Sequence, residues 1–154
     1  MQLLELTPAE IAFLSAPSSA PDGLQTRLTR KLAATLSARL RLPVQATAQP
    51  APAPVDAPVT PVWQPDAILA GLWLTRRLGG RHVAGASSFV PATLVRTLDA
   101  VLAECWLDAP PQAALPAALA WRITTDLAQA TVAVQVPRFP TDMTRWAQEV
   151  IRHG

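Results

Sequence analysis

The residues that could carry out chemistry in this chain are few, and their spacing matches no common catalytic or metal-binding pattern. His82 and His153 are the only histidines, and neither has Cys, His or a carboxylate nearby at metal-ligand spacing. Cys105 is the only cysteine, which rules out an intramolecular disulfide and a cysteine metal framework. Its place beside Leu102 and Trp106 on an apolar helix face predicts a small core residue.

Serine chemistry and phosphate binding are not predicted either. Ser87 and Ser88 precede a predicted helix, where serine usually caps the helix or forms a turn, and no G-x-S-x-G elbow surrounds them. The segment Gly79-Gly80-Arg81-His82 lacks the glycine spacing of phosphate-binding loops.

The carboxylates are scattered. Asp99 and Glu104 lie five residues apart on a predicted helix and so should not share a face, which argues against a general acid and base pair. Asp108, Asp126 and Asp142 fall at element ends, where Asp normally caps or turns. We therefore expect no enzymatic activity. The open alternative is an enzyme with a dispersed site, which a deep pocket lined by Arg76, Arg77, His82 and a carboxylate would favour.

Composition indicates one globular domain. Of the 154 residues, 50% are hydrophobic and 16% are charged, which excludes a disordered, solvating chain. The net charge is only +2, and the basic residues are not interleaved with aromatics, so no nucleic-acid partner is expected.

The first residues lack the basic and apolar pattern of a secretory signal, and the longest apolar run, 67–74, is shorter than the ~20 residues that span a bilayer. We expect a cytoplasmic protein without membrane insertion and without a cofactor.

The first part of the chain divides at about residue 22. Thr7-Pro8-Ala9-Glu10 is a capping-box pattern that predicts a short helix to about Ser15, and a linker follows, so 1–22 is expected to be separate from the domain 23–154. Leucine then recurs every fourth residue, which predicts one helix with a continuous apolar stripe (Leu24, Leu28, Leu32, Leu36, Leu40).

The segment 43–65 is rich in proline, which forbids a central strand or helix there. We expect an extended linker or an edge segment, with Val55, Val59 and Val62 able to attach it to the core; a polyproline docking motif is the alternative.

The rest of the sequence predicts an α+β domain. An apolar helix over about 66–78 ends at Gly79-Gly80, and its apolar surface all round suggests a central position. A second apolar helix spans about 91–107. Alternation of apolar residues near 119–125 and 130–137 indicates a β-hairpin, and Thr141 can cap a last helix whose apolar residues are Met143, Trp146, Val150 and Ile151.

Four segments of the chain, taken in order, resemble the middle domain of FliM-type flagellar switch and SctQ-type (SpaO/HrcQ-like) type III secretion proteins. They are LTRKLAATLSARLRLPV, ILAGLWLTRRLGG, FVPATLVRTLDAVLAECW and ALAWRITTDLAQATVAVQVP. The resemblance covers about Leu24 to Pro137, and its sharpest element is the pair Gly79-Gly80. It implies a single CheC-like α+β domain with helices packed on a mixed or antiparallel sheet. His82 stands where the third glycine of the flagellar Gly-Gly-x-Gly loop would be, which favours the secretion branch.

The resemblance implies a non-enzymatic scaffold of a cytoplasmic sorting platform or flagellar C-ring, peripheral to the inner-membrane base of the apparatus. Its partners would be a SPOA-domain protein, which the family normally carries in the same chain, an adaptor or rotor-type ring protein, and further copies of itself. The partner-binding residues would lie in the loop after the glycine pair (Gly79, Gly80, Arg81, His82, Ser87, Ser88).

Two alternatives accompany this resemblance. One is a type III secretion chaperone or regulator that binds an effector segment on a sheet edge. The other concerns the opening LTPAEIAFLSA, which also resembles the FliM peptide that binds CheY, although core packing is the simpler expectation. CheC-type phosphatases position water with a Glu and Asn pair, and this chain contains no Asn.

Overall fold

The structure is a computed structural model that describes residues 20–51, 56–77, 89–108 and 117–153. These residues form helices and an antiparallel four-stranded sheet of order β1-β3-β4-β2, which is the predicted α+β class. The elements are α2 (Ala20–Leu40), β1 (Gln45–Gln49), β2 (Val62–Pro65), α3 (Ala67–Arg77), α4 (Ala92–Asp108), β3 (Ala118–Thr124), β4 (Gln129–Gln135) and α5 (Pro140–His153). The short helix predicted before Ser15 lies outside the described residues.

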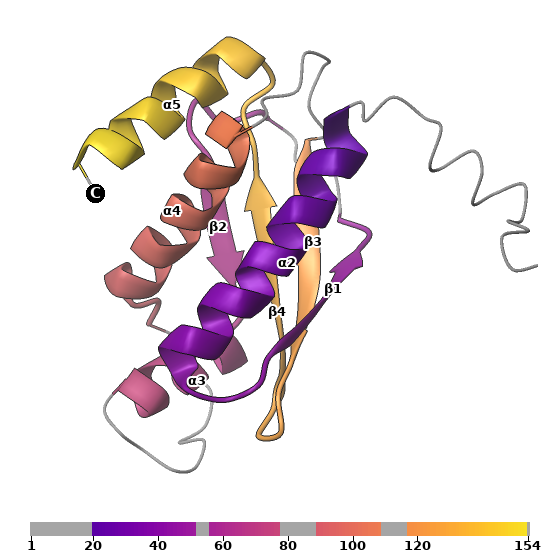
Figure 1. Cartoon of the computed structure of the whole chain (residues 1–154), viewed down its shortest axis with the longest axis vertical. Coiled ribbons are helices and arrows are strands. Elements are labelled where there is room, and N and C mark those ends of the chain that lie inside the picture. The colour runs from indigo at the N-terminus through magenta and orange to yellow at the C-terminus, as the bar shows by residue number, and fades with distance from the viewer. Residues whose placement is uncertain (1–19, 52–55, 78–88, 109–116, 154) are drawn as a thin grey trace, which may run out of the picture.

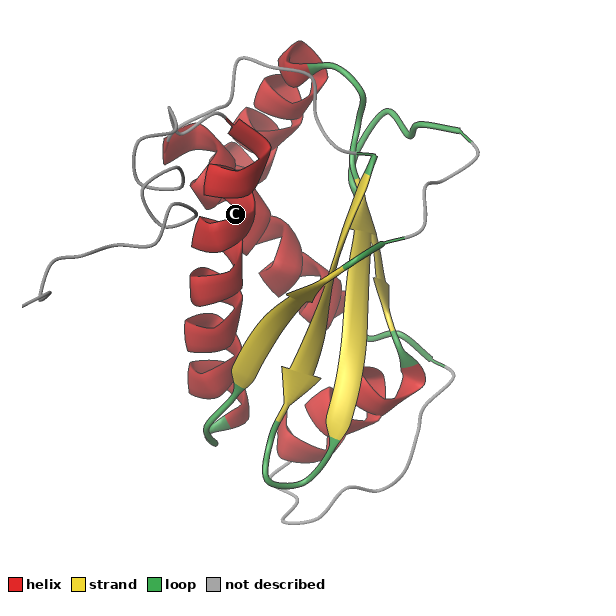
Figure 2. Ribbon diagram, turned by 90° about the vertical axis from the view of Figure 1, so that its right-hand side faces the viewer, coloured by secondary structure: helices red, strands yellow, loops and turns green. Residues whose placement is uncertain are grey.

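The helices α2, α4 and α5 lie on one face of the sheet, and α3 lies across the end of the sheet where β2 ends (Figures 1 and 2). Along β3 the side chains of Leu119, Trp121 and Ile123 are buried beneath the helices, whereas Arg122 between them is exposed. This alternation is typical of an antiparallel sheet that packs one face on a core. The opposite face of the described strands therefore carries mainly Gln, Thr and Ala side chains.

The central hairpin is the one predicted from alternation. β3 pairs with β4 from Ala118 opposite Gln135 to Thr124 opposite Gln129. The turn is fixed by Thr125, whose Oγ1 accepts hydrogen bonds from the backbone N–H groups of Leu127 and Ala128. Such a side-chain-to-backbone turn needs no glycine.

The proline-rich segment contributes the two edge strands, so the edge alternative is correct for its two ends. β1 pairs with β3 and β2 pairs with β4, and each has no second strand neighbour in the described sheet. The expectation that Val59 and Val62 attach the segment to the core is wrong, because they are 77% and 43% exposed. Trp63 makes that attachment instead, since the two-residue alternation of β2 turns it inward while Val62 faces out. Val55 lies outside the described residues.

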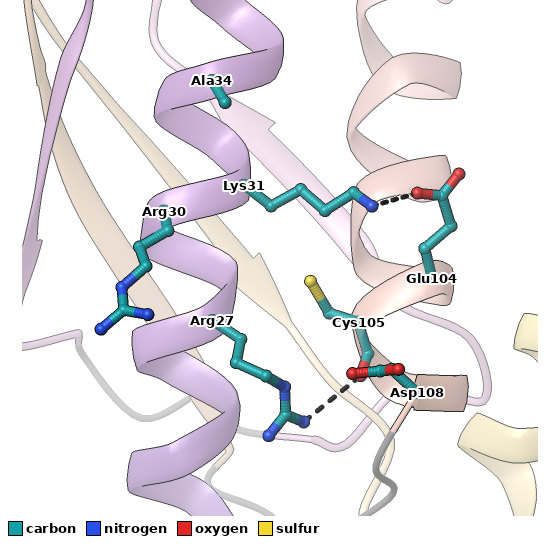
Figure 3. Close-up of a pocket in the computed structure, with 7 residues that line it drawn as sticks. All are labelled: Arg27, Arg30, Lys31, Ala34, Glu104, Cys105 and Asp108. Carbon is teal, nitrogen blue, oxygen red and sulfur yellow. Dashed lines mark hydrogen bonds and ion pairs between the residues drawn. The ribbon is translucent and has the colours of Figure 1, made fainter.

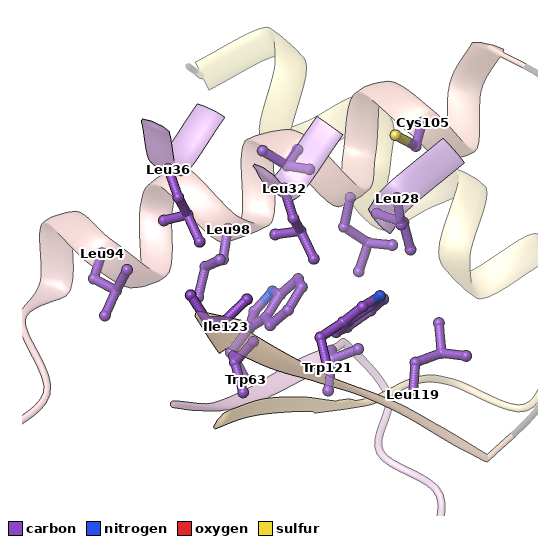
Figure 4. Close-up of a cluster of buried hydrophobic side chains, with 14 of the residues drawn as sticks. Leu28, Leu32, Leu36, Trp63, Leu94, Leu98, Cys105, Leu119, Trp121 and Ile123 are labelled. Carbon is purple, nitrogen blue, oxygen red and sulfur yellow. The ribbon is translucent and has the colours of Figure 1, made fainter. Parts of the chain in front are cut away.

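The leucine stripe of α2 is buried as predicted, with Leu28, Leu32 and Leu36 fully enclosed (Figure 4). α2 ends in a left-handed residue, Arg41, at φ 58°. The side chain of Arg76 donates hydrogen bonds to the backbone carbonyls of Leu40, at 2.9 Å, and Arg41, at 3.1 Å. These are among the last carbonyls of a helix, which lack intrahelical partners. Arg76 thus joins the end of α3 to the end of α2.

Three buried tryptophans each donate an indole hydrogen bond to a threonine on another element. Trp121 of β3 bonds Thr29 of α2 at 2.8 Å, Trp73 of α3 bonds Thr93 of α4 at 2.9 Å, and Trp106 of α4 bonds Thr144 of α5 at 2.9 Å. A buried indole N–H usually has such an acceptor. The three bonds therefore fix how neighbouring elements are placed along one another.

The starts of α3 and α5 follow different rules. α3 begins after Asp66, whose carboxylate accepts from the backbone N–H of Leu69 and from both donors of Thr131 on β4. The predicted cap at Thr141 is wrong: α5 begins at Pro140, two residues before the start that this cap implies, and the carbonyl of Phe139 accepts its first hydrogen bonds. Proline at the first helical position is already set to helical φ, which explains the shift.

Burial follows the predicted faces with two exceptions. Leu72, Leu98, Ile123 and Val134 are all buried, as predicted. Ile151, however, is 46% exposed at the end of α5. The second exception is α3, which was predicted to be covered on all sides. Ile68 is 38% exposed, whereas Leu69 to Trp73 are buried.

We predict that Leu98→Ala lowers the free energy of unfolding by about 2–5 kcal/mol, because it leaves a cavity between α4 and the sheet. The matched control is Leu127→Ala in the hairpin turn, where the side chain is 39% exposed. Urea unfolding followed by circular dichroism measures both. Equal losses in the two variants would contradict the assigned core.

Candidate functional site

The predicted partner-binding loop lies outside the described residues, so its placement remains a prediction. This applies to every residue assigned to it (Gly79, Gly80, Arg81, His82, Ser87, Ser88). The structure does describe the two ends that hold this loop, which are the last turn of α3 and the residues before α4.

These two ends are fixed to each other and to α2. The Trp73–Thr93 hydrogen bond joins α3 to the first turn of α4, and Arg76 holds α3 to the end of α2. Beside this junction, Phe89 and Val90 are 66% and 41% exposed. Two adjacent exposed apolar side chains at a rigid loop base are a feature that burial patterns in the sequence did not single out.

An open, charged hollow of about 630 Å³ lies between α2 and α4 (Figure 3). Lys31 of α2 forms an ion pair with Glu104 of α4. Arg27 donates a hydrogen bond of 3.3 Å from Nη2 to the backbone carbonyl of Cys105. These two contacts bridge the helices, while Arg30 points away from α4 in Figure 3.

The thiol of Cys105 and the amine of Lys31, which both line this hollow, have raised pKa values. Burial raises the pKa of the Cys105 thiol, against the smaller opposing effects of Lys31 and Arg27. A thiol with a raised pKa is less ionised at neutral pH, and the thiolate is the reactive form. The hydrogen bond with Glu104 raises the pKa of Lys31, which keeps its amine protonated. The prediction that Cys105 is a core residue is confirmed by its 5% exposure.

A second hollow of about 460 Å³ lies between α4 and α5. Asp99 and Glu104 both line it, so the prediction that these two carboxylates face different ways is wrong in that respect. The helix α5 packs against α4 and contributes Val150 and Ile151 to the lining of the same hollow. Glu104 is already paired with Lys31, and His153 pairs at 3.6 Å with Glu149.

Asp99 is the most perturbed group among those the structure describes. Burial raises its pKa from the ordinary value of 3.8 to about 6. The indole N–H of Trp63 lowers the pKa but does not cancel the rise. Trp63 Nε1 is buried and forms no hydrogen bond of good geometry in the described part of the chain, so its attraction to Asp99 is weak.

Neither hollow is the pocket that would favour an enzyme. Arg76 contacts the carbonyls of α2, and the side chains of Arg77 and His82 lie outside the described residues. Within the described ranges, no group of three or more His, Cys, Asp or Glu residues is placed to hold a metal ion. The perturbed pKa of Asp99 could not be predicted from the sequence, because it depends on the burial of this side chain in the folded chain.

No protein-family model matches the chain, and no curated protein matches it in sequence. Within the residues that the structure describes, no helix combines the length and apolar character needed to cross a membrane.

We predict that Asp99→Asn stabilises the fold at neutral pH and not in acid. Because the pKa of Asp99 is higher in the folded chain than the ordinary 3.8, the folded state binds more protons between about pH 4 and pH 6, and stability falls as the pH rises through this range. Above it, removing the charge should raise the free energy of unfolding by about 1–3 kcal/mol.

Thermal unfolding at about pH 7.5 and pH 4 measures this, with the exposed carboxylate variant Asp56→Asn as control. The melting temperature of Asp99→Asn should exceed that of the unchanged protein only at the higher pH. A loss of stability at pH 7.5 would show that the Asp99 charge stabilises the fold.

Proposed function

We propose that this chain is a non-enzymatic scaffold that acts by protein–protein binding, in a type III secretion sorting platform or a flagellar-type C-ring. The proposal rests on the resemblance of its segments to the FliM/SctQ middle domain. The observation that supports it best is the junction of α3, α4 and the end of α2, where exposed Phe89 and Val90 lie beside the predicted binding loop.

The junction has the features of a recognition surface. Loops held by a rigid base commonly carry binding residues. Here Trp73–Thr93 and the Arg76 hydrogen bonds hold the base, so binding would not have to order it. Phe89 supplies an aromatic side chain of the kind enriched at interfaces.

The proposed partners are a SPOA-domain protein and an adaptor or rotor-type ring protein, and the proposed location is the cytoplasmic base of the apparatus. The loop residues Gly79, Gly80, Arg81 and His82 would contact such a partner together with Phe89. The charged hollow between α2 and α4 is a second surface that could bind polar groups, but its main cations already contact α4.

We predict that Phe89→Ser weakens co-purification with the SPOA-domain protein of the same organism, while the matched variant Phe139→Ser does not. Phe139 is 58% exposed and precedes α5, whose start lies at the opposite end of the molecule from the start of α4 (Figure 1). Both changes remove an exposed phenylalanine, so their effects on solubility should be similar.

The loop itself is tested by Gly80→Asp and Arg81→Glu. Because the sequence predicts a surface loop here, and surface substitutions usually change stability by about 0.5 kcal/mol or less, each should leave the melting temperature within a few degrees. Each should nevertheless reduce binding and secretion. Normal binding by Phe89→Ser and both loop variants at matched protein levels would contradict the proposed surface.

A further inference from the structure

The strand β1 is an edge strand without the features that normally protect an edge. Its sequence, Gln45-Ala46-Thr47-Ala48-Gln49, has no charge and no proline, and on the side away from β3 it has no strand partner within the described residues. Proteins usually block such edges with lysine, proline or a bulge. An unblocked edge is a surface that can add another strand.

The five residues also read the same in both directions, with Thr47 at the centre. If two copies of β1 paired antiparallel about a two-fold axis at Thr47, each Gln45 would lie opposite Gln49 of the other copy and each Ala46 opposite Ala48. The two copies of Thr47 would face each other. A two-fold interface requires this kind of self-complementarity, and Thr–Thr pairs across antiparallel strands are favourable.

We propose that β1 pairs with β1 of a second copy of this chain, so that the two sheets join into one continuous antiparallel sheet across a two-fold axis.

The surroundings of β1 fit this arrangement. Ala48 and Thr47 are exposed, and Ala46 is half-buried, so small side chains border the edge on both faces. With its amide oxygen facing Arg122, Gln49 accepts hydrogen bonds of 3.0 Å from Nε and Nη2, which anchors one end of the strand to β3. Pro43 and Pro50 flank β1 in the chain and limit the pairing to the segment between them, because proline cannot donate to a sheet.

The other edge is less suited to the same role. β2 has four residues and contains Pro65, and its outward-facing Val62 and Gln64 form no symmetric pattern. A contact between β1 and β2 would be head-to-tail and would continue into a chain of molecules, whereas β1 with β1 closes after two copies. A single short strand pair buries little area, so the dimer should be weak and dependent on concentration.

Single-cysteine variants and mild oxidation of the full chain test the register. Antiparallel partners opposite each other have Cα atoms about 4.5–5.5 Å apart, which suits a disulfide. Thr47→Cys should therefore give a covalent dimer, whereas Gln45→Cys and the other-edge control Gln64→Cys should remain monomers. A mixture of Gln45→Cys and Gln49→Cys should cross-link. The native Cys105 is buried and should not interfere.

The same axis can be tested by charge. Thr47→Lys and Thr47→Glu should each abolish concentration-dependent dimers in analytical ultracentrifugation, and mixing the two should restore them. No dimer from Thr47→Cys, or equal cross-linking of Thr47→Cys, Gln45→Cys and Gln64→Cys, would overturn the inference. The test needs no SPOA partner and is independent of the proposed scaffold role.

Discussion

The hydrogen bond from the indole N–H of Trp121 to Thr29 holds α2 in place on the sheet. Trp121 is fully buried on β3, stacks on Trp63 of β2 with ring centres 6.2 Å apart, and donates to Thr29 of α2. Moving α2 by one turn so that Ala33 takes the place of Thr29 would leave the N–H buried without an acceptor, which costs about 1–3 kcal/mol. The leucine stripe alone would not distinguish the observed position of α2 from one shifted by a turn, because leucine repeats every fourth residue.

The base of the proposed binding surface depends on the position of α2. Once α2 is fixed, its last carbonyls lie where Arg76 of α3 can bond them, and Trp73 then bonds Thr93 at the start of α4. The base of the loop between α3 and α4 is thus linked back to the centre of the sheet through named hydrogen bonds. The proposed binding surface carries Phe89 and Val90 at the end of this series of contacts.

Local patterns predicted much of the fold but little of the site. The leucine repeat identified α2, the two-residue alternation identified the β3–β4 hairpin, and apolar periodicity identified α3 and α4. The strands β1 and β2 were expected only as parts of an extended linker or edge segment, because the many prolines around them argue against regular strands. The tryptophan–threonine bonds join residues 92, 20 and 38 positions apart, and the high pKa of Asp99 arises from its burial in the folded chain, so neither follows from local sequence.

The central claim is that a partner binds the end of the molecule where α3 ends and α4 begins. Hydrogen–deuterium exchange of the full chain, alone and with saturating SPOA-domain protein, tests this most directly because it reports protection segment by segment. The account predicts new protection between residues 78 and 95, with no change around the start of α5. Protection confined to α5 or to the open face of the sheet would contradict it.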